Sequence, residues 1–219
     1  MLKKVFSAAA LCFSLAFGAS AQDGGGIKPA AGEVTGEVQL NLTGTNTVGL
    51  GLNQLRGRYF LAPNTAIRAS FILDVQNDTE DDDFSRTSTL FVLAPGIEKH
   101  FAGTERLSPY VGAELSFTKF SANEEGDNYE IDGAWSNGGN NITNRNYFGF
   151  GLGAVAGADY YFARHVYLGV EFGFGLQYRK EGDVEINPES GPNTTIDGEG
   201  GSLRLRPTVN SGLRLGFVF

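Results

Sequence analysis

Residues 166–179 read VYLGVEFGFGLQYR, and their side chains change character at every step. One parity is apolar throughout and consists of Val166, Leu168, Val170, Phe172, Phe174, Leu176 and Tyr178. The other parity is mostly small or polar and consists of Tyr167, Gly169, Glu171, Gly173, Gly175, Gln177 and Arg179. A period of two predicts a β-strand. Strands of soluble proteins average about five to six residues, whereas a tilted strand that crosses a bilayer needs roughly nine to eleven. This long apolar face therefore predicts a membrane-spanning strand.

The same alternation recurs along the chain, and turn residues separate one stretch from the next. The other stretches cover residues 34–43, 50–61, 66–76, 87–100, 108–119, 146–162 and 202–219. The alternation is least regular at 87–100, and none of the stretches shows a sustained helical period. With the stretch quoted above, the pattern predicts an all-β fold over residues 33–219, an eight-stranded antiparallel transmembrane β-barrel.

The connections between these stretches alternate between short and long. The short ones contain APNTA, AGTER and ARH, whereas the long polar ones cover about 77–86, 120–145 and 180–201. The first connection, about 44–49, is short and does not follow the rule. Outer-membrane barrels have short turns at the periplasmic end and longer loops outside. The sequence therefore predicts this orientation.

The N-terminal residues 1–21 have the composition of a secretory signal peptide. Two lysines precede an apolar run that ends in the small residues Ala19 and Ala21. This pattern predicts cleavage between Ala21 and Gln22. The alternative, a membrane-anchor helix, is disfavoured because the apolar run is short. Residues 22–32 (QDGGGIKPAAG) are then expected to form a flexible periplasmic leader.

The charge and the cysteine content exclude some classes of protein. The whole chain has a net charge of −8, and loss of the two lysines in residues 1–21 brings it to −8 − 2 = −10. Such acidity argues against a nucleic-acid partner. The only cysteine, Cys12, lies in the predicted signal peptide, so no disulfide is expected in the mature chain.

The C-terminal stretch SGLRLGFVF, residues 211–219, ends an amphipathic strand on a phenylalanine. Together with the signal peptide and the eight alternating stretches, it resembles the small outer-membrane barrels of the OmpA/OmpX type. The resemblance covers residues 33–219 and implies a location in the bacterial outer membrane. It also implies that Leu213, Leu215, Phe217 and Phe219 form the signal that the barrel-assembly machinery reads.

Two further features qualify this resemblance. The stretch PGIEKHF, residues 95–101, and the glutamine after the predicted cleavage site resemble short barrels of Bacteroidota. The barrel is expected to stand without the peptidoglycan-binding domain of longer relatives.

The inward parity of the predicted strands collects charges of both signs. A lumen charge network is predicted from Glu37, Arg56, Arg58, Arg68, Asp74, Glu114, Asp159, Glu171, Arg204, Arg206 and Arg214. Eight-stranded barrels leave an interior that side chains nearly fill, and buried charges there must be paired or hydrated. The favoured interpretation is a salt-bridge plug, and the alternative is an ion path or gate. Inward-facing glycines on 146–162 and 166–179 would leave room for the arginines.

Catalytic, cofactor-binding and metal sites are not predicted. His100 and His165 flank short turns at the expected periplasmic rim, so no Ser/His/acid set is expected to converge near the outer leaflet. GLGAVA, residues 151–156, imitates a dinucleotide motif but continues as a strand, whereas that motif needs a helix to begin. The acidic run NDTEDDD, residues 77–83, is interpreted as a solvated loop, with divalent-ion binding as the minority alternative.

The remaining expectations concern partners. Trp135, the only tryptophan, lies in the connection 120–145 and is a candidate loop contact that could also pack on the barrel rim. The expected partners are outer-membrane lipid, lipopolysaccharide and the assembly machinery, with a possible protein partner at the surface. The predicted role is structural or surface-interacting; a narrow pore is the alternative, and an outer-leaflet lipid enzyme is disfavoured.

Overall fold

A computed structural model describes residues 26–40, 52–81, 84–137 and 141–219 of the chain, and it is all β in these residues. The predicted signal peptide lies outside them. The strands are β1 (Val34–Leu40), β2 (Leu52–Ala62), β3 (Thr65–Asp81), β4 (Phe84–His100), β5 (Leu107–Gly126), β6 (Tyr129–Asp132), β7 (Trp135–Ser136), β8 (Ile142–Thr143), β9 (Tyr147–Ala163), β10 (Val166–Glu181), β11 (Val184–Pro188), β12 (Thr194–Ile196) and β13 (Gly201–Val218).

Eight of these strands close into an antiparallel barrel. Following the pairings around the ring gives the order β1, β2, β3, β4, β5, β9, β10, β13, after which β13 pairs with β1 again. The closing pair is in register from Thr35 opposite Val218 to Leu40 opposite Leu213. The predicted eight-stranded fold is confirmed for the barrel, and the described residues contain five further short strands that lie beyond it.

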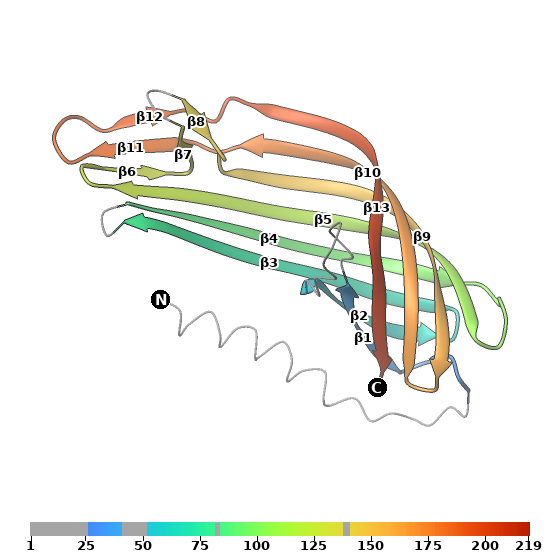
Figure 1. Ribbon diagram of the computed structural model, residues 1–219. Coiled ribbons are helices and arrows are strands. Elements are labelled where there is room, and N and C mark those ends of the chain that lie inside the picture. Colours follow the sequence, from blue (N-terminus) through green and yellow to red (C-terminus); the bar gives the residue numbers. More distant parts are fainter. Residues whose placement is uncertain (1–25, 41–51, 82–83, 138–140) are drawn as a thin grey trace.

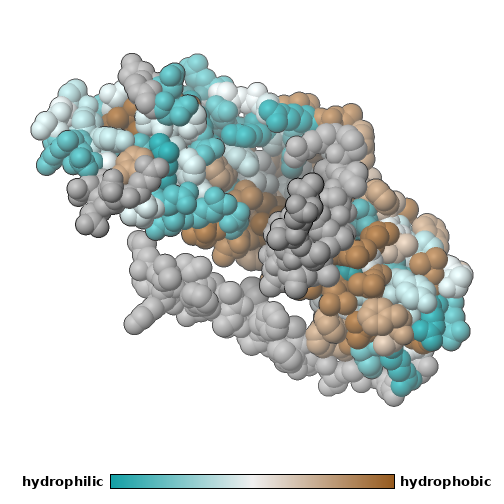
Figure 2. Space-filling view, in the orientation of Figure 1, coloured by the Kyte–Doolittle hydropathy of each residue, from teal (hydrophilic) through white to brown (hydrophobic). Residues whose placement is uncertain are grey.

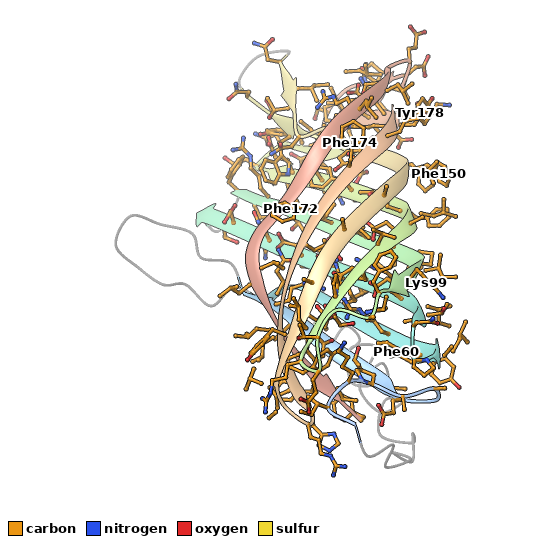
Figure 3. All side chains as sticks on the ribbon, turned by 90° about the vertical axis from the view of Figure 1, so that its right-hand side faces the viewer. Phe60, Lys99, Phe150, Phe172, Phe174 and Tyr178 are labelled. Carbon is orange, nitrogen blue, oxygen red and sulfur yellow. The ribbon has the colours of Figure 1, made fainter. Side chains whose placement is uncertain are left out.

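The alternation of side chains sorts them between the two faces of the barrel wall. On β10 the apolar parity points outward, so that Phe172 and Phe174 are 58% and 50% exposed. The opposite parity points into the lumen, where Glu171 is 2% exposed. Figure 3 shows Phe150 and Tyr178 projecting outside the ribbon. No helix among the described residues is long and apolar enough to cross a bilayer.

The two ends of the barrel differ in the length of their connections. The turns after β2, β4 and β9 lie at the end where the C-terminus lies, at the lower right of Figure 1. The five short strands lie at or beyond the opposite end. Figure 2 shows a hydrophobic zone between two more hydrophilic ends. Outer-membrane barrels keep short turns at the periplasmic end, so the short strands lie on the extracellular side.

The long connections hold more regular structure than the sequence predicts. The connection 77–86 is largely a continuation of β3 and β4, which pair out to Asp81 opposite Phe84. In the connections 120–145 and 180–201, β6, β11 and β12 extend the sheet from β5, and β7 pairs with β8. We call β6, β7, β8, β11, β12 and the outer ends of β3, β4 and β5 the outer sheet. Its added strands are short and lie outside the lipid, so they lack the long apolar parity that reveals the barrel strands.

The leader predicted over 22–32 is described from residue 26 onward, and this part is tethered across the periplasmic mouth. Ile27 packs against Tyr161, Tyr167 and Val218. The Lys28 ammonium donates to the carbonyl oxygen of Ala102 at 2.7 Å, in the turn after β4. The backbone amide of Gly32 donates to Phe60 on β2 at 2.8 Å. We call residues 26–33 the strap, because these contacts lie on several sides of the barrel.

Candidate functional site: the lumen network and the outer sheet

The lumen holds a compact network of ion pairs. It consists of the carboxylates of Glu37, Glu98, Glu114, Asp159 and Glu171 and the guanidinium groups of Arg56, Arg58, Arg68 and Arg214. These residues come from β1, β2, β3, β4, β5, β9, β10 and β13, so every strand of the barrel contributes at least one. All except Glu114 are buried as residues. The network therefore joins the barrel wall to itself across its interior.

Glu171 lies at the centre of the network. Its carboxylate accepts hydrogen bonds from Arg56 at 3.0 Å and from Arg68 at 2.8 Å. The Tyr110 hydroxyl also donates to it at 2.6 Å. Arg68 continues the chain of contacts, because it lies 2.7 Å from Glu98 and 3.2 Å from Glu114. Charge-assisted hydrogen bonds of this kind compensate the cost of burying the ions.

A second group lies closer to the periplasmic turns. Arg58 lies 2.6 Å from Asp159 and 2.9 Å from Glu37. Arg214 bridges the same two carboxylates, at 3.1 Å from Asp159 and 2.9 Å from Glu37. A methyl group at Gly169 would lie 2.6 Å from the Arg214 guanidinium, so this glycine leaves room for the arginine against the inner wall of β10.

Not all of the predicted lumen residues join this network. Asp74 and Arg204 lie on the inward parity but are exposed, above the network. The side chain of Arg206 lies outside the described residues. The other predicted members are brought together, and the structure adds Glu98 with the hydroxyls of Tyr110, Tyr167 and Ser70.

Sequence reasoning missed Glu98 because the alternation of β4 is irregular. Residues 90–94 read LFVLA and are apolar on both parities. Lys99, at the other end of the strand, is a charge on the outward parity. The hydropathy of the two parities therefore does not show which face of this strand points into the lumen. The usable signal is that Glu98 and His100 share a parity with Gly96, opposite Pro95, Ile97 and Lys99.

The structure brings a serine, a histidine and an acid together, at the periplasmic end of the lumen and not near the outer leaflet. The Nδ1 atom of His100 lies 3.0 Å from the Ser108 hydroxyl, and Nε2 lies 3.2 Å from Glu98. The three residues are 4%, 5% and 1% exposed, so a substrate has no access to the hydroxyl. Glu98 is also held by Arg58 and Arg68. The set therefore serves as hydrogen-bonded packing at the periplasmic end of the lumen.

A small cavity lies above the network. Its volume is about 70 Å³. Inward side chains of Glu114, Ser116 and Gln177 line it together with the glycines of β9 and β10. Water is the occupant that such a small polar space fits.

The outer sheet has a core of its own. Ile131, Ala134 and Val184 are buried there, with Tyr129, Ile142, Ile186 and Ile196 packed around them. The predicted loop contact, Trp135, is half-buried, and its indole nitrogen donates to the carbonyl oxygen of Thr87 at 3.3 Å. Trp135 therefore packs on the rim, over the outer end of β4.

Glu124 is the buried charge of this outer sheet. Its carboxylate lies 2.8 Å from Arg86 and accepts a hydrogen bond from the Tyr129 hydroxyl at 2.8 Å. This hydrogen bond raises the pKa of Tyr129 above its usual value. The backbone amide of Ser136 also donates to Glu124 at 2.8 Å. The polar contacts fix the β7 segment against β4 and β5.

The remaining predicted residues lie on the membrane-facing wall or in the acidic run. Leu213, Phe217 and Phe219 are exposed outward on or just after β13, and Leu215 is half-buried between them. The part of NDTEDDD that the structure describes lies along the outer end of β3. In the described residues, no group of three His, Cys, Asp or Glu side chains is arranged to hold a metal ion.

A closed β-barrel with an apolar outer band and ion pairs inside defines the class as an outer-membrane barrel. Residues 83–215 match the model of the "Putative OmpA-OmpF-like porin family", and the chain belongs to this family. The expected location in the outer membrane is confirmed by this membership.

Two solved structures are similar to the chain at low identity. The N-terminal β-barrel domain of Pseudomonas aeruginosa OprF is 16% identical, with a TM-score of 0.39, covering 87% of this chain and all of that one. Ail, the attachment invasion locus protein of Yersinia pestis, is 16% identical, with a TM-score of 0.39, covering 85% of this chain and 96% of that one. No curated protein sequence matches the chain.

Proposed function

We propose that this protein is a closed structural barrel that presents the outer sheet to surface partners, and that it is neither an enzyme nor an open pore. The observation that carries the proposal is the lumen network, in which Glu171 alone joins β10 to Arg56 on β2, Arg68 on β3 and Tyr110 on β5. Side chains that pair across the interior occupy the path that ions would need. The ordered outer sheet supplies a rigid surface beyond the membrane.

Conductance across a planar lipid bilayer tests the closed lumen. We expect the purified protein to give no steady ion current. The double variant Arg68→Ala/Glu171→Ala removes the centre of the network without changing the net charge, and we expect it to conduct. A steady current through the unmodified protein, abolished when Glu114 is changed to Gln, would instead establish the narrow pore.

The cellular part of the proposal includes export and membrane partners. The signal peptide would be cleaved between Ala21 and Gln22, and lipid, lipopolysaccharide and the assembly machinery would be the partners of the folding and folded barrel. The intact mass of the protein extracted from outer membranes tests the cleavage site. A mass that retains residues 1–21 would overturn it.

A further inference from the structure

Two lysines mark one sector of the outer wall, directly above the apolar band. On β5 the outward residues from Pro109 to Phe117 are all apolar, and the next outward residue is Lys119. On β10 the outward residues from Val166 to Tyr178 are apolar, and the next is Lys180. Both lysines are exposed. Each therefore ends the band of its own strand with a positive charge.

The strand register places these two lysines in one row across the sheet, perpendicular to the strands. Lys119 lies opposite Phe148 on β9, and Phe148 lies opposite Lys180 on β10. The three residues thus form one outward row, in which two ammonium groups flank an aromatic ring that is 51% exposed. Two strand spacings separate the lysines, which is about 9–10 Å between their backbones.

The height of this row places it at the headgroups of the outer leaflet. From Val166 to Tyr178 a strand tilted by about 40° rises roughly 30 Å along the membrane normal. The apolar band of an outer-membrane barrel is about 25 Å tall. Phe150 and Tyr178, one row lower, lie outside the ribbon in Figure 3 as a girdle of aromatic residues would.

The cations of the row have no anionic partner among the residues that the structure describes. Among the described residues, no ion pair or hydrogen bond involves the side chain of Lys119 or Lys180. The nearest acid along β10, Glu181, lies on the opposite parity, 3.9 Å from Arg145. The neighbouring strands end their apolar bands with uncharged residues, Thr89 on β4 and Gly201 on β13. The positive charge therefore does not continue onto the two strands that flank this sector.

We propose that Lys119, Phe148 and Lys180 form a binding site for the phosphorylated headgroup of an outer-leaflet lipid. The ammonium groups would pair with phosphate, and the Phe148 ring would pack on the first carbons of the acyl chains. Lysine near a membrane surface attracts anionic lipid in this way. The site rests on the lipid partnership proposed above and on the barrel spanning the outer membrane, and it is independent of the proposed closed lumen and of any partner of the outer sheet.

Native mass spectrometry of the protein in a neutral maltoside detergent tests this site. The probes are diphosphorylated lipid A, the same lipid after dephosphorylation, and inorganic phosphate alone. We expect the unmodified protein to retain the diphosphorylated lipid and to bind the dephosphorylated one more weakly. Lys119→Gln and Lys180→Gln should each weaken retention about fivefold, and the double variant about 25-fold.

Lys99→Gln is the matched control. Lys99 is also an exposed lysine on the outer wall, but it lies at the periplasmic end of β4, toward the other end of the barrel from Tyr178 in Figure 3. Its substitution should leave lipid retention unchanged, and all variants should keep the heat-modifiable mobility of a folded barrel. Equal loss in Lys99→Gln, or no loss in the double variant, would overturn the proposal. Binding of inorganic phosphate with the same lysine dependence would also overturn it, because the ligand would then be a free anion.

Discussion

The Glu171 carboxylate accepts hydrogen bonds from Arg56, Arg68 and Tyr110, and each donor comes from a different strand. Glu171→Gln keeps the size of the side chain but removes the charge that two buried guanidinium groups share. Breaking a buried ion pair from one side costs about 3–5 kcal/mol. We expect the free energy of unfolding to fall by this amount in urea titrations of the protein in liposomes.

Asp74→Asn is the control for this loss. Asp74 has the same inward parity on β3 but is exposed above the network, where it accepts a hydrogen bond from the side-chain amide of Gln76 at 3.4 Å. Because Asp74 is exposed, removing its charge should change the unfolding free energy by less than about 0.5 kcal/mol. If the two substitutions cost the same, the network does not stabilise the barrel as described.

Single residues of the lumen were predictable where one parity of a strand is apolar. Arg56, Arg68 and Glu171 could be assigned to the lumen because the opposite parity of each strand is apolar. The parity of a residue is enough to predict whether its side chain points into the lumen or toward lipid. Their pairings could not be predicted, since a shift of register by two residues leaves the pattern unchanged. Register depends on turn geometry and on the closing pair, β1 with β13, which only the folded ring defines.

At the scale of elements, one buried side chain of β11 holds this strand in the core of the outer sheet. Val184 is fully buried and packs with Ile131 and Ala134. We expect Val184→Ala to loosen the outer sheet by about 1–2.5 kcal/mol, because two methyl groups leave a well-packed core. Trp135, the only tryptophan, should report this as a shift of its fluorescence emission toward that of water-exposed indole.

The stability of the barrel should not change in Val184→Ala. Val184 lies on the extracellular side of the membrane strands, so the heat-modifiable mobility and the urea midpoint of the barrel should stay as in the unmodified protein. Val166→Ala, an equivalent truncation at the first residue of β10, should leave Trp135 emission unchanged. A simultaneous loss of barrel and tryptophan signals in Val184→Ala would contradict the independence of the two parts.

Elements outside the membrane were the least predictable part of the fold. The sequence predicts loops at 77–86, 120–145 and 180–201, whereas the described residues there form strand continuations and the hairpin of β11 with β12. Inside a bilayer, the side chains that face lipid must be apolar, so membrane-spanning strands show a clear alternation in the sequence. In water, strands can pair through backbone hydrogen bonds even where both parities are polar. Such strands show no alternation of hydropathy in the sequence.

At the scale of the whole molecule, we propose that the barrel is closed in two places along its axis. The lumen network crosses the interior, and the strap covers the periplasmic mouth through Ile27, Lys28 and Gly32. Ser108 lies between these closures, buried beside His100 near the periplasmic turn after β4. Ser116 lies on the other side of the network, in the upper cavity. Ser108 and Ser116, both on β5, therefore lie on the periplasmic and the extracellular side of the lumen network.

Single cysteines at these serines test whether the strap is a seal. In mature protein, which contains no other cysteine if cleavage follows Ala21, Ser108→Cys should react slowly with a charged thiol reagent. Deleting residues 22–30 should speed that reaction about tenfold, the factor that about 1.4 kcal/mol of lost packing at Ile27 corresponds to. Ser116→Cys should react at one rate with or without the strap, because its access is from the extracellular side. Equal, fast labelling of both cysteines in the intact protein would show that neither the network nor the strap closes the lumen. The narrow pore would then be the favoured function.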